Sequence, residues 1–343
     1  MMYQRILLTD DGTPLAASAA RYAAALARDG GEVLVLRVAH DAGIDPASVT
    51  PATWSERLAA AEAEAPAPQP FLRHVLDDLG RSGTWRTGAL TVRGNPRDAI
   101  AEVAERVGAD LVVMGSHGYH GLARMVHGSV TDHVNRRLHR APLLVCHGTP
   151  PAGSNPFARV AVTLDETPFA DAAVAHASAV AQVTGATLEL IRVLEMRGKF
   201  VTATIPWSGQ GAYRHRGAEG SPLVGGRRPI NPADVVVPGL RLEAVPDHNV
   251  GAGIIQAGRS SECGVIVMST HAPGTGARLL HGSVGDYVAS HFTCGAVMLV
   301  RPADDPAEAS SPRGLVALPT PAASDQATGE VGESAEEAGR KVA

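Results

Sequence analysis

The sequence predicts an α/β protein with two tandem, doubly wound domains, each built on a five-stranded, mostly parallel sheet flanked by helices. The chain has 343 residues, which exceeds the usual size of one hydrophobic core. Short apolar segments alternate with longer helical ones, the order found in doubly wound sheets. Residues also recur at a constant offset of 154, since Thr9 and Ser129 correspond to Thr163 and Ser283. A repeat of this length indicates a duplicated domain.

The first half begins with two predicted strands on either side of a helix. Residues 6–9 and 33–38 are short, apolar segments with the composition of buried parallel strands. Between them, Thr13 and Pro14 are residue types preferred at a helix N-cap and at the first helical position. The alanine-rich residues 15–27 that follow predict a strong helix.

The middle of the first half predicts three more helices and two more strands. Helical patterns at residues 56–64 and 71–79 are separated by a proline-rich break. A strand is expected at residues 86–92, a helix at 96–107 and a strand at 111–114. Ligands of parallel sheets bind at the carboxyl ends of the strands, so the residues that follow these strands are candidates for a binding site.

A glycine-rich segment follows residue 114 and has the residue types of a phosphate-binding loop. Its pattern is Gly115-x2-Gly118-x9-Gly128-Ser129. Glycine lets the backbone approach a ligand closely, and a helix N-terminus presents free N–H groups to an anion. The alternative is a long loop with a good N-cap at Ser129. The helix after Ser129 is expected to end near residue 140, before a closing strand at 141–145.

The second half begins and ends like the first, with a closing strand at residues 297–300. Its middle differs, because residues 198–238 contain many Gly, Pro and Arg residues and little periodicity. They predict a long irregular insertion where the first half has a helix. The expected boundaries are a first domain at 1–148, a linker at 149–158, a second domain at 159–301 and a disordered acidic tail at 302–343.

Charge, cysteine content and hydropathy exclude several classes of protein. The tail holds eight acidic and three basic residues, so the formal charge of −5 arises there, and the neutral body lacks a basic groove for nucleic acid. The three cysteines form no paired motif, which favours a reducing compartment. No apolar segment has the length of a membrane span, and the start lacks a signal-peptide pattern. We therefore expect a soluble, cytoplasmic protein.

Several motifs in order resemble the ATP-binding type of the universal stress protein family. They are the first strand with its turn at residues 6–14, the second strand, Gly94-x-Pro96, the segment 110–115, the glycine loop and the closing strand. The resemblance spans about residues 3–147. It implies a Rossmann-like, adenine-nucleotide α-hydrolase-like fold that binds ATP, and a role as a nucleotide-dependent regulator or stress-response factor.

The resemblance also implies which residues bind the nucleotide. Members of the family hold the adenine near the first two strands and the phosphates in the glycine loop. For this sequence, the adenine and ribose would be bordered by Thr9, Asp10 and Asp11, with Val38 against the base. The ribose and the first phosphates would be lined by Met114, Gly115, His117 and Gly118, and the outer phosphates would be held by Gly128, Ser129, Val130 and Thr131. Asp10 departs from the family's usual single aspartate, so its role stays open. Asp11 has the alternative role of closing the turn before the first helix.

Other polar residues near the loop have weaker claims to a role. Six histidines crowd this region: His117, His120, His127, His133, His139 and His147. They show no HExxH or paired Cys/His spacing, which argues against a metal site. Mg²⁺ could accompany the nucleotide, although no carboxylate cage is visible. Arg124 could meet a phosphate, but a lone arginine is more often solvated.

The second glycine loop has lost two of its glycines. Ser269 and Ala272 stand in place of Gly115 and Gly118, and Pro273 follows. Each replacement adds a Cβ where the backbone must approach a ligand, and proline also removes a donor. We expect the second half to bind ATP weakly or not at all and to serve as a packing partner.

The sequence shows no recognisable catalytic apparatus. It lacks a Walker A motif, a GxGxxG pattern after the first strand and a nucleophile–base signature, so at most slow ATP hydrolysis is expected. An ATP-consuming enzyme and a nucleotide-free interaction module remain the alternatives. The two closing strands are expected at sheet edges, where they could pair to form an internal pseudo-dimer. A further homodimer is left open.

Overall fold

The structure of the protein is a computed structural model that describes residues 3–27, 30–63, 85–116, 130–148, 154–164, 170–196, 199–207, 241–245, 249–270 and 284–301. The first half contains the strands β1 (Arg5–Thr9), β2 (Glu32–Ala39), β3 (Arg86–Arg93), β4 (Leu111–Gly115) and β5 (Leu143–Cys146). Its helices are α1 (Pro14–Leu26), the short 3-10 helix η1 (Pro46–Ser48), α2 (Pro51–Ala63), α4 (Pro96–Val107) and α5 (Val130–Arg137).

These elements agree closely with the expected ones. All five strands lie at the predicted positions, and α4 has the predicted bounds. Two features of the sequence fix α4: Asn95 accepts a bond from the Arg97 N–H at its start, and Gly108 adopts φ 65° at its end. The helix expected to reach residue 140 ends at Arg137, and α2 begins five residues before the predicted residue 56. The helix expected at 71–79 lies outside the described residues.

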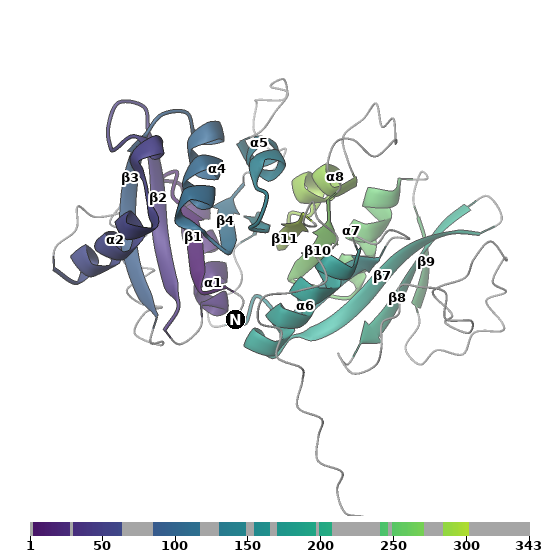
Figure 1. Ribbon diagram of the computed structural model, residues 1–343. Helices are drawn as coiled ribbons and strands as arrows, with labels where there is room; N and C mark the ends of the chain where they lie inside the picture. The colour runs from purple at the N-terminus through teal and green to yellow at the C-terminus, as the bar shows by residue number, and fades with distance from the viewer. Residues whose placement is uncertain are drawn as a thin grey trace, which may run out of the picture.

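The second half contains the strands β6 (Arg159–Leu164), β7 (Thr187–Met196), β8 (Lys199–Trp207), β9 (Arg241–Ala244), β10 (Val265–Ser269) and β11 (Ala296–Val300). Its helices are α6 (Ala170–Thr184), α7 (Val250–Ser260) and α8 (Val284–His291). The two halves share one 11-stranded sheet in the order β3-β2-β1-β4-β5-β11-β10-β6-β7-β8-β9 (Figure 1). The α/β fold with a mostly parallel sheet is confirmed.

The expectation of an irregular segment at residues 198–238 is wrong for residues 199–207. They form β8, which pairs antiparallel with β7 and with β9. The second half therefore contributes six strands, where five were expected. The residues of β8 are mostly Val, Thr, Ile and Ala, whereas the whole segment is rich in Gly, Pro and Arg. The average composition of the segment therefore hides the strand. Thr202 and Thr204 of β8 are buried. Residues 208–240 lie outside the described residues.

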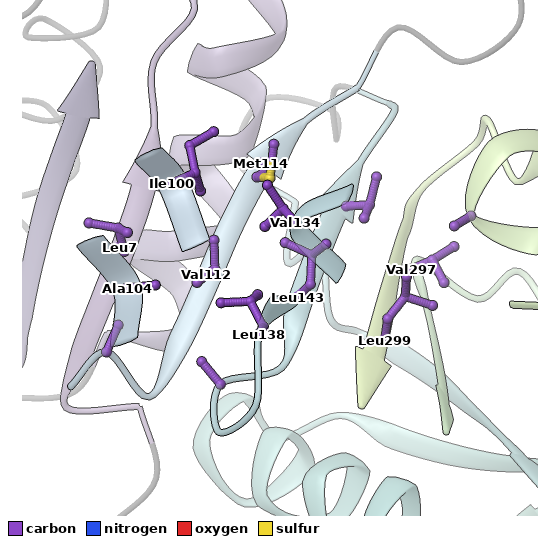
Figure 2. Packing of buried hydrophobic residues seen from close by; sticks show 14 of the residues in the cluster. Leu7, Ile100, Ala104, Val112, Met114, Val134, Leu138, Leu143, Val297 and Leu299 are labelled. Atoms are coloured by element: carbon purple, nitrogen blue, oxygen red, sulfur yellow. The ribbon is translucent and has the colours of Figure 1, made fainter. Parts of the chain in front are cut away.

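The closing strands β5 and β11 join the two halves, as expected. They run antiparallel, with Val145 opposite Val297 and Leu143 opposite Leu299. Apolar clusters cover both faces of the sheet, and each cluster contains residues from both halves. Leu143, Val297 and Leu299 belong to the same cluster, which also includes Val134 of α5 (Figure 2). The pairing prediction is therefore confirmed, and the core continues across the junction.

The described residues were also searched for membrane-spanning helices. None of the helices in these ranges is both long enough and apolar enough to cross a bilayer.

Candidate functional site

The candidate site lies where β1, β2 and β4 end. In the first half the chain passes from β1 outward to β2 and β3, and then returns to the other side of β1 to form β4 and β5. The point between β1 and β4 is where ligands bind in doubly wound sheets. Thr9 ends β1, Gly115 ends β4, and Val38 lies one residue before the end of β2. The topology thus brings these predicted residues to one edge of the sheet.

Asp10 is the buried carboxylate of this edge. Its backbone N–H donates to the Leu36 carbonyl at 2.8 Å, which extends the pairing of β1 with β2 by one residue. Its Oδ1 accepts from the Gly12 N–H at 2.8 Å, and its Oδ2 lies 3.7 Å from the Arg37 guanidinium. The side chain is 1% exposed, and Oδ2 has no hydrogen-bond partner among the described residues. Arg37 therefore compensates a buried negative charge.

Asp11 is the exposed carboxylate of the same turn. Its Oδ1 accepts from the Thr13 N–H at 3.0 Å and from the Thr13 hydroxyl at 2.6 Å. Thr13 is the N-cap residue of α1, as predicted, but its side chain makes no capping bond, and its hydroxyl donates to Asp11. Gly12 adopts φ 79°, which allows the turn. Asp11 thus closes the turn while remaining accessible to solvent.

Val38 provides an apolar surface at the end of β2. It is partly buried and packs against the core cluster that also includes Ile44 at its margin. The Ile44 N–H donates to the Thr91 carbonyl at 3.1 Å, and Ile44 accepts from the Arg93 N–H at 3.0 Å. The segment that follows β2 therefore folds against the end of β3. Val38 and Ile44 both pair with Val92 of β3 and form an apolar margin at this end of the sheet.

The end of β4 is closely packed against α1. A Cβ on Gly115 would lie 3.0 Å from the backbone C and O of Leu15, so glycine is needed there for the close approach. Met114 points the other way, into the core beside Ile100 and Val134 (Figure 2). Only the backbone of Met114 is therefore able to contribute to the site, because its side chain is buried.

Val130 and Thr131 begin α5 and are both partly buried. They are separated from Gly115 by residues outside the described ranges, which include His117, Gly118, Gly128 and Ser129. Asp132 in the same first turn is paired with Arg136 at 2.8 Å. This ion pair weakens the repulsion that Asp132 would exert on an anion at the helix N-terminus.

Two residues of this region were not recognised in the sequence. Arg37 is one of them. The repeat contains a signal for it, because the pair Arg37-Val38 recurs as Arg192-Val193 in β7 of the second half. His147 is the other; in the sequence it is only one of six histidines near the loop. Its Nδ1 lies 3.0 Å from the Ser116 carbonyl, directly after Gly115, and its Nε2 contacts the Ala289 carbonyl of α8.

The second half repeats only part of the site. Ser269 ends β10 as Gly115 ends β4, and the Thr270 N–H donates to the Val300 carbonyl at 2.8 Å. The equivalent bond in the first half joins the Ser116 N–H to the Cys146 carbonyl at 2.9 Å. Asp165, Ala272 and Ser283 lie outside the described residues. Within the ranges given above, no three His, Cys, Asp or Glu side chains gather so that they could hold a metal ion.

Comparison with known proteins gives a consistent result. The model of the universal stress protein family matches residues 2–147 and again residues 156–301. A universal stress protein of Methanocaldococcus jannaschii is 31% identical over 145 residues, which are 42% of this chain and 82% of that protein. A second universal stress protein of that organism is 32% identical over 74 residues, and the match spans 22% of this chain and 43% of that protein.

A solved structure resembles both halves together. The universal stress protein of Archaeoglobus fulgidus has a TM-score of 0.53 with this chain at 18% identity, and the match covers 89% of this chain and 98% of that one. At this identity the likeness shows a shared fold. The two family matches together span most of the 343 residues.

Proposed function

Because the chain belongs to the universal stress protein family, we propose that its N-terminal half binds ATP and that the protein acts as a nucleotide-dependent regulator in a stress response. One observation carries this proposal. The ends of β1, β2 and β4 bring Asp11, Val38 and Gly115 together at the point where the strand order reverses. A base needs an apolar margin, a ribose hydroxyl needs an exposed acceptor, and a phosphate needs a close approach of the backbone.

The base and ribose would lie over β1 and β2. Val38 offers an apolar surface to adenine, and the exposed Asp11 carboxylate can accept from a ribose hydroxyl or an exocyclic amine. Thr9 and Asp10 border the same position. Because Asp10 is buried and faces Arg37 at 3.7 Å, it supports the turn beneath the ligand.

The phosphates would follow the glycine segment toward α5. Gly115 and the Met114 backbone would lie near the ribose and first phosphate, together with His117 and Gly118. The N-terminus of a helix favours anions, and α5 begins at Val130. The outer phosphates would be held there by Gly128, Ser129, Val130 and Thr131. A Mg²⁺ ion would be held mainly by the phosphates, as is usual for this ion.

The test is the nucleotide content of the freshly purified protein, followed by titration with ATP. We expect about one adenine nucleotide per chain, because Ser269 and Ala272 add Cβ atoms to the second loop. Asp11→Ala should weaken ATP binding about tenfold, the size expected when one hydrogen bond to a charged group is lost. The matched control is Asp165→Ala, which changes the corresponding aspartate of the second half and should leave the affinity unchanged.

Three results would contradict parts of this proposal. About two nucleotides per chain would show that the second loop is functional. Rapid multiple turnover of ATP would favour an ATP-consuming enzyme over a regulator. A folded protein that neither contains nor binds nucleotide would replace the proposal with an interaction module.

A further inference from the structure

The junction between the halves contains a pair of contacts related by the internal repeat. His147 follows β5, and Arg301 occupies the equivalent position after β11, at the offset of 154. The His147 Nε2 contacts the Ala289 carbonyl in the last turn of α8, and Arg301 donates to the Arg136 carbonyl in the last turn of α5 at 2.7 Å. Each half therefore holds the helix that follows the glycine loop of the other half.

His147 makes a second contact that reaches the candidate site. Its Nδ1 lies 3.0 Å from the Ser116 carbonyl, while the Ser116 N–H donates to the Cys146 carbonyl at 2.9 Å. Both backbone groups of Ser116 are thus held by consecutive residues at the end of β5. Ser116 directly follows Gly115, the last residue of β4, so these two contacts hold the backbone at the end of β4.

The number of N–H groups on the side chain at position 147 determines how many of the two carbonyls it can bind. Both ring nitrogens of His147 face carbonyl oxygens, which only accept hydrogen bonds. A neutral imidazole carries one N–H, so it can donate to one of the two carbonyls at a time. Burial lowers the pKa of His147, with partial opposition from the Ala289 and Ser116 carbonyls. An arginine at this position, as in the second half, has enough donors for both carbonyls.

We propose that His147 is a positioning residue through which the C-terminal half sets the nucleotide affinity of the N-terminal site. The proposal rests on the nucleotide binding proposed above. Contact with α8 holds the imidazole, and the imidazole holds Ser116. Ser116 is next to Gly115, which would lie near the ribose and first phosphate. Arg301 holds the far end of α5, whose first turn would face the same phosphates. The second half thus supports ligand binding at a site built from residues of the first half.

The affinity test compares two substitutions of His147. His147→Leu removes both nitrogens and should weaken ATP binding about tenfold, as expected for the loss of a buried hydrogen bond. His147→Arg introduces the residue of the equivalent position and should keep the affinity within about threefold of the unchanged protein. Isothermal titration with ATP measures both values. Wild-type affinity in His147→Leu, or equal weakening in both variants, would overturn the proposal.

A matched control loosens the same junction on the opposite face of the sheet. The Tyr3 hydroxyl is hydrogen-bonded to the His176 Nδ1 of α6 at 2.8 Å, and the position equivalent to Tyr3 in the second half is Phe157. Tyr3→Phe should lower the melting temperature without changing ATP affinity, because Tyr3 does not contact Ser116. If Tyr3→Phe weakens binding as much as His147→Leu does, general loosening of the junction explains the effect and the proposal fails.

Hydrogen exchange in the nucleotide-free protein separates this proposal from the proposed function. His147→Leu should speed exchange of the Ser116 amide and of α8, whereas Tyr3→Phe should not change the Ser116 amide. If the unchanged protein binds no ATP, the proposed function fails. Faster exchange of the Ser116 amide in His147→Leu would still support the link through His147. Unchanged exchange of Ser116 in His147→Leu would refute the link, whatever the protein binds.

Discussion

At the scale of single residues, the two adjacent aspartates have different roles despite their shared chemistry. Asp10 faces the interior, where Gly12 and Arg37 surround it, and Asp11 faces solvent, where Thr13 donates to it twice. A buried carboxylate is costly unless a positive charge or hydrogen bonds compensate it. Asp10 is therefore expected to matter mainly for stability, and Asp11 mainly for ligand binding.

The pairing of Arg37 with Asp10 predicts a loss of stability when the cation is removed. Arg37→Gln should lower the free energy of unfolding by about 1 kcal/mol, because the buried carboxylate loses its compensating charge while Arg37 itself is partly exposed. Urea unfolding measures the change. The control is Arg93→Gln, whose partner Asp45 lies 3.9 Å away and is exposed, so little change is expected. Equal effects of the two substitutions would contradict the role assigned to Arg37.

At the scale of secondary-structure elements, β8 is the main departure from a plain duplication. It separates β7 from β9 and pairs with both, so its backbone groups are used on both sides. In the first half, β3 occupies the place beside β2 that β8 occupies beside β7, and it runs parallel to its neighbour. The second half has therefore widened its sheet by one strand at this side.

The position of β8 predicts a strong response to proline. Ala203→Pro should destabilise the protein by about 3 kcal/mol, because proline lacks the N–H that a central strand needs and Ala203 is buried. The control is Lys199→Pro at the exposed first residue of β8, where a smaller loss is expected. Thermal unfolding followed by circular dichroism would distinguish the two. A small effect at Ala203 would mean that β8 is not paired on both sides.

The elements that could be predicted are those whose signals are local. The strands at residues 33–38 and 86–92 and the helix at 96–107 follow from hydrophobic periodicity, Pro96 and Gly108, all of which act within a few residues. The strand β8 was missed because its nine residues are adjacent to a long segment of different composition. The meeting of the ends of β1, β2 and β4 at one edge could be predicted because topology brings the carboxyl ends of parallel strands together.

The contacts of Arg37 and His147 could not be predicted for a different reason. Their partners, Asp10 and Ala289, are distant in sequence, and the contacts exist only after the sheet has formed. Whether Met114 faces the ligand or the core depends similarly on the helices that cover the sheet. The family resemblance supplies the residue position, whereas the packing of α4 and α5 decides the direction of the side chain.

At the scale of the whole molecule, the junction has a partly buried histidine on its α1 and α6 face. The His176 Nδ1 is hydrogen-bonded to the Tyr3 hydroxyl, and desolvation lowers the pKa of His176 from 6.5 to about 4. The unfolded chain therefore binds a proton at higher pH than the folded one does. Stability from the neutral histidine is complete above pH 6.5 and is lost as the pH falls from 6.5 to about 4.

This shift predicts an acid-sensitive junction. Between pH 7 and pH 4 the free energy of unfolding should fall by up to about 3 kcal/mol through His176. Asp110 contributes with the opposite sign, because burial raises its pKa to about 6. The measurement is therefore a comparison of urea unfolding between the unchanged protein and His176→Tyr, which introduces the residue of the equivalent position in α1. Identical pH profiles in the two proteins would exclude His176 as the source.

The pairing of β5 with β11 also determines how this protein can evolve. Two separate subunits meet at a rate set by their concentration, whereas two halves of one chain are always present in equal number and always meet. Separate subunits with an impaired loop would pair at random with intact subunits. In a single chain, every molecule instead contains one impaired loop and one intact loop. The second half is free to change its ligand chemistry as long as β11 and its flanking residues preserve the match to β5.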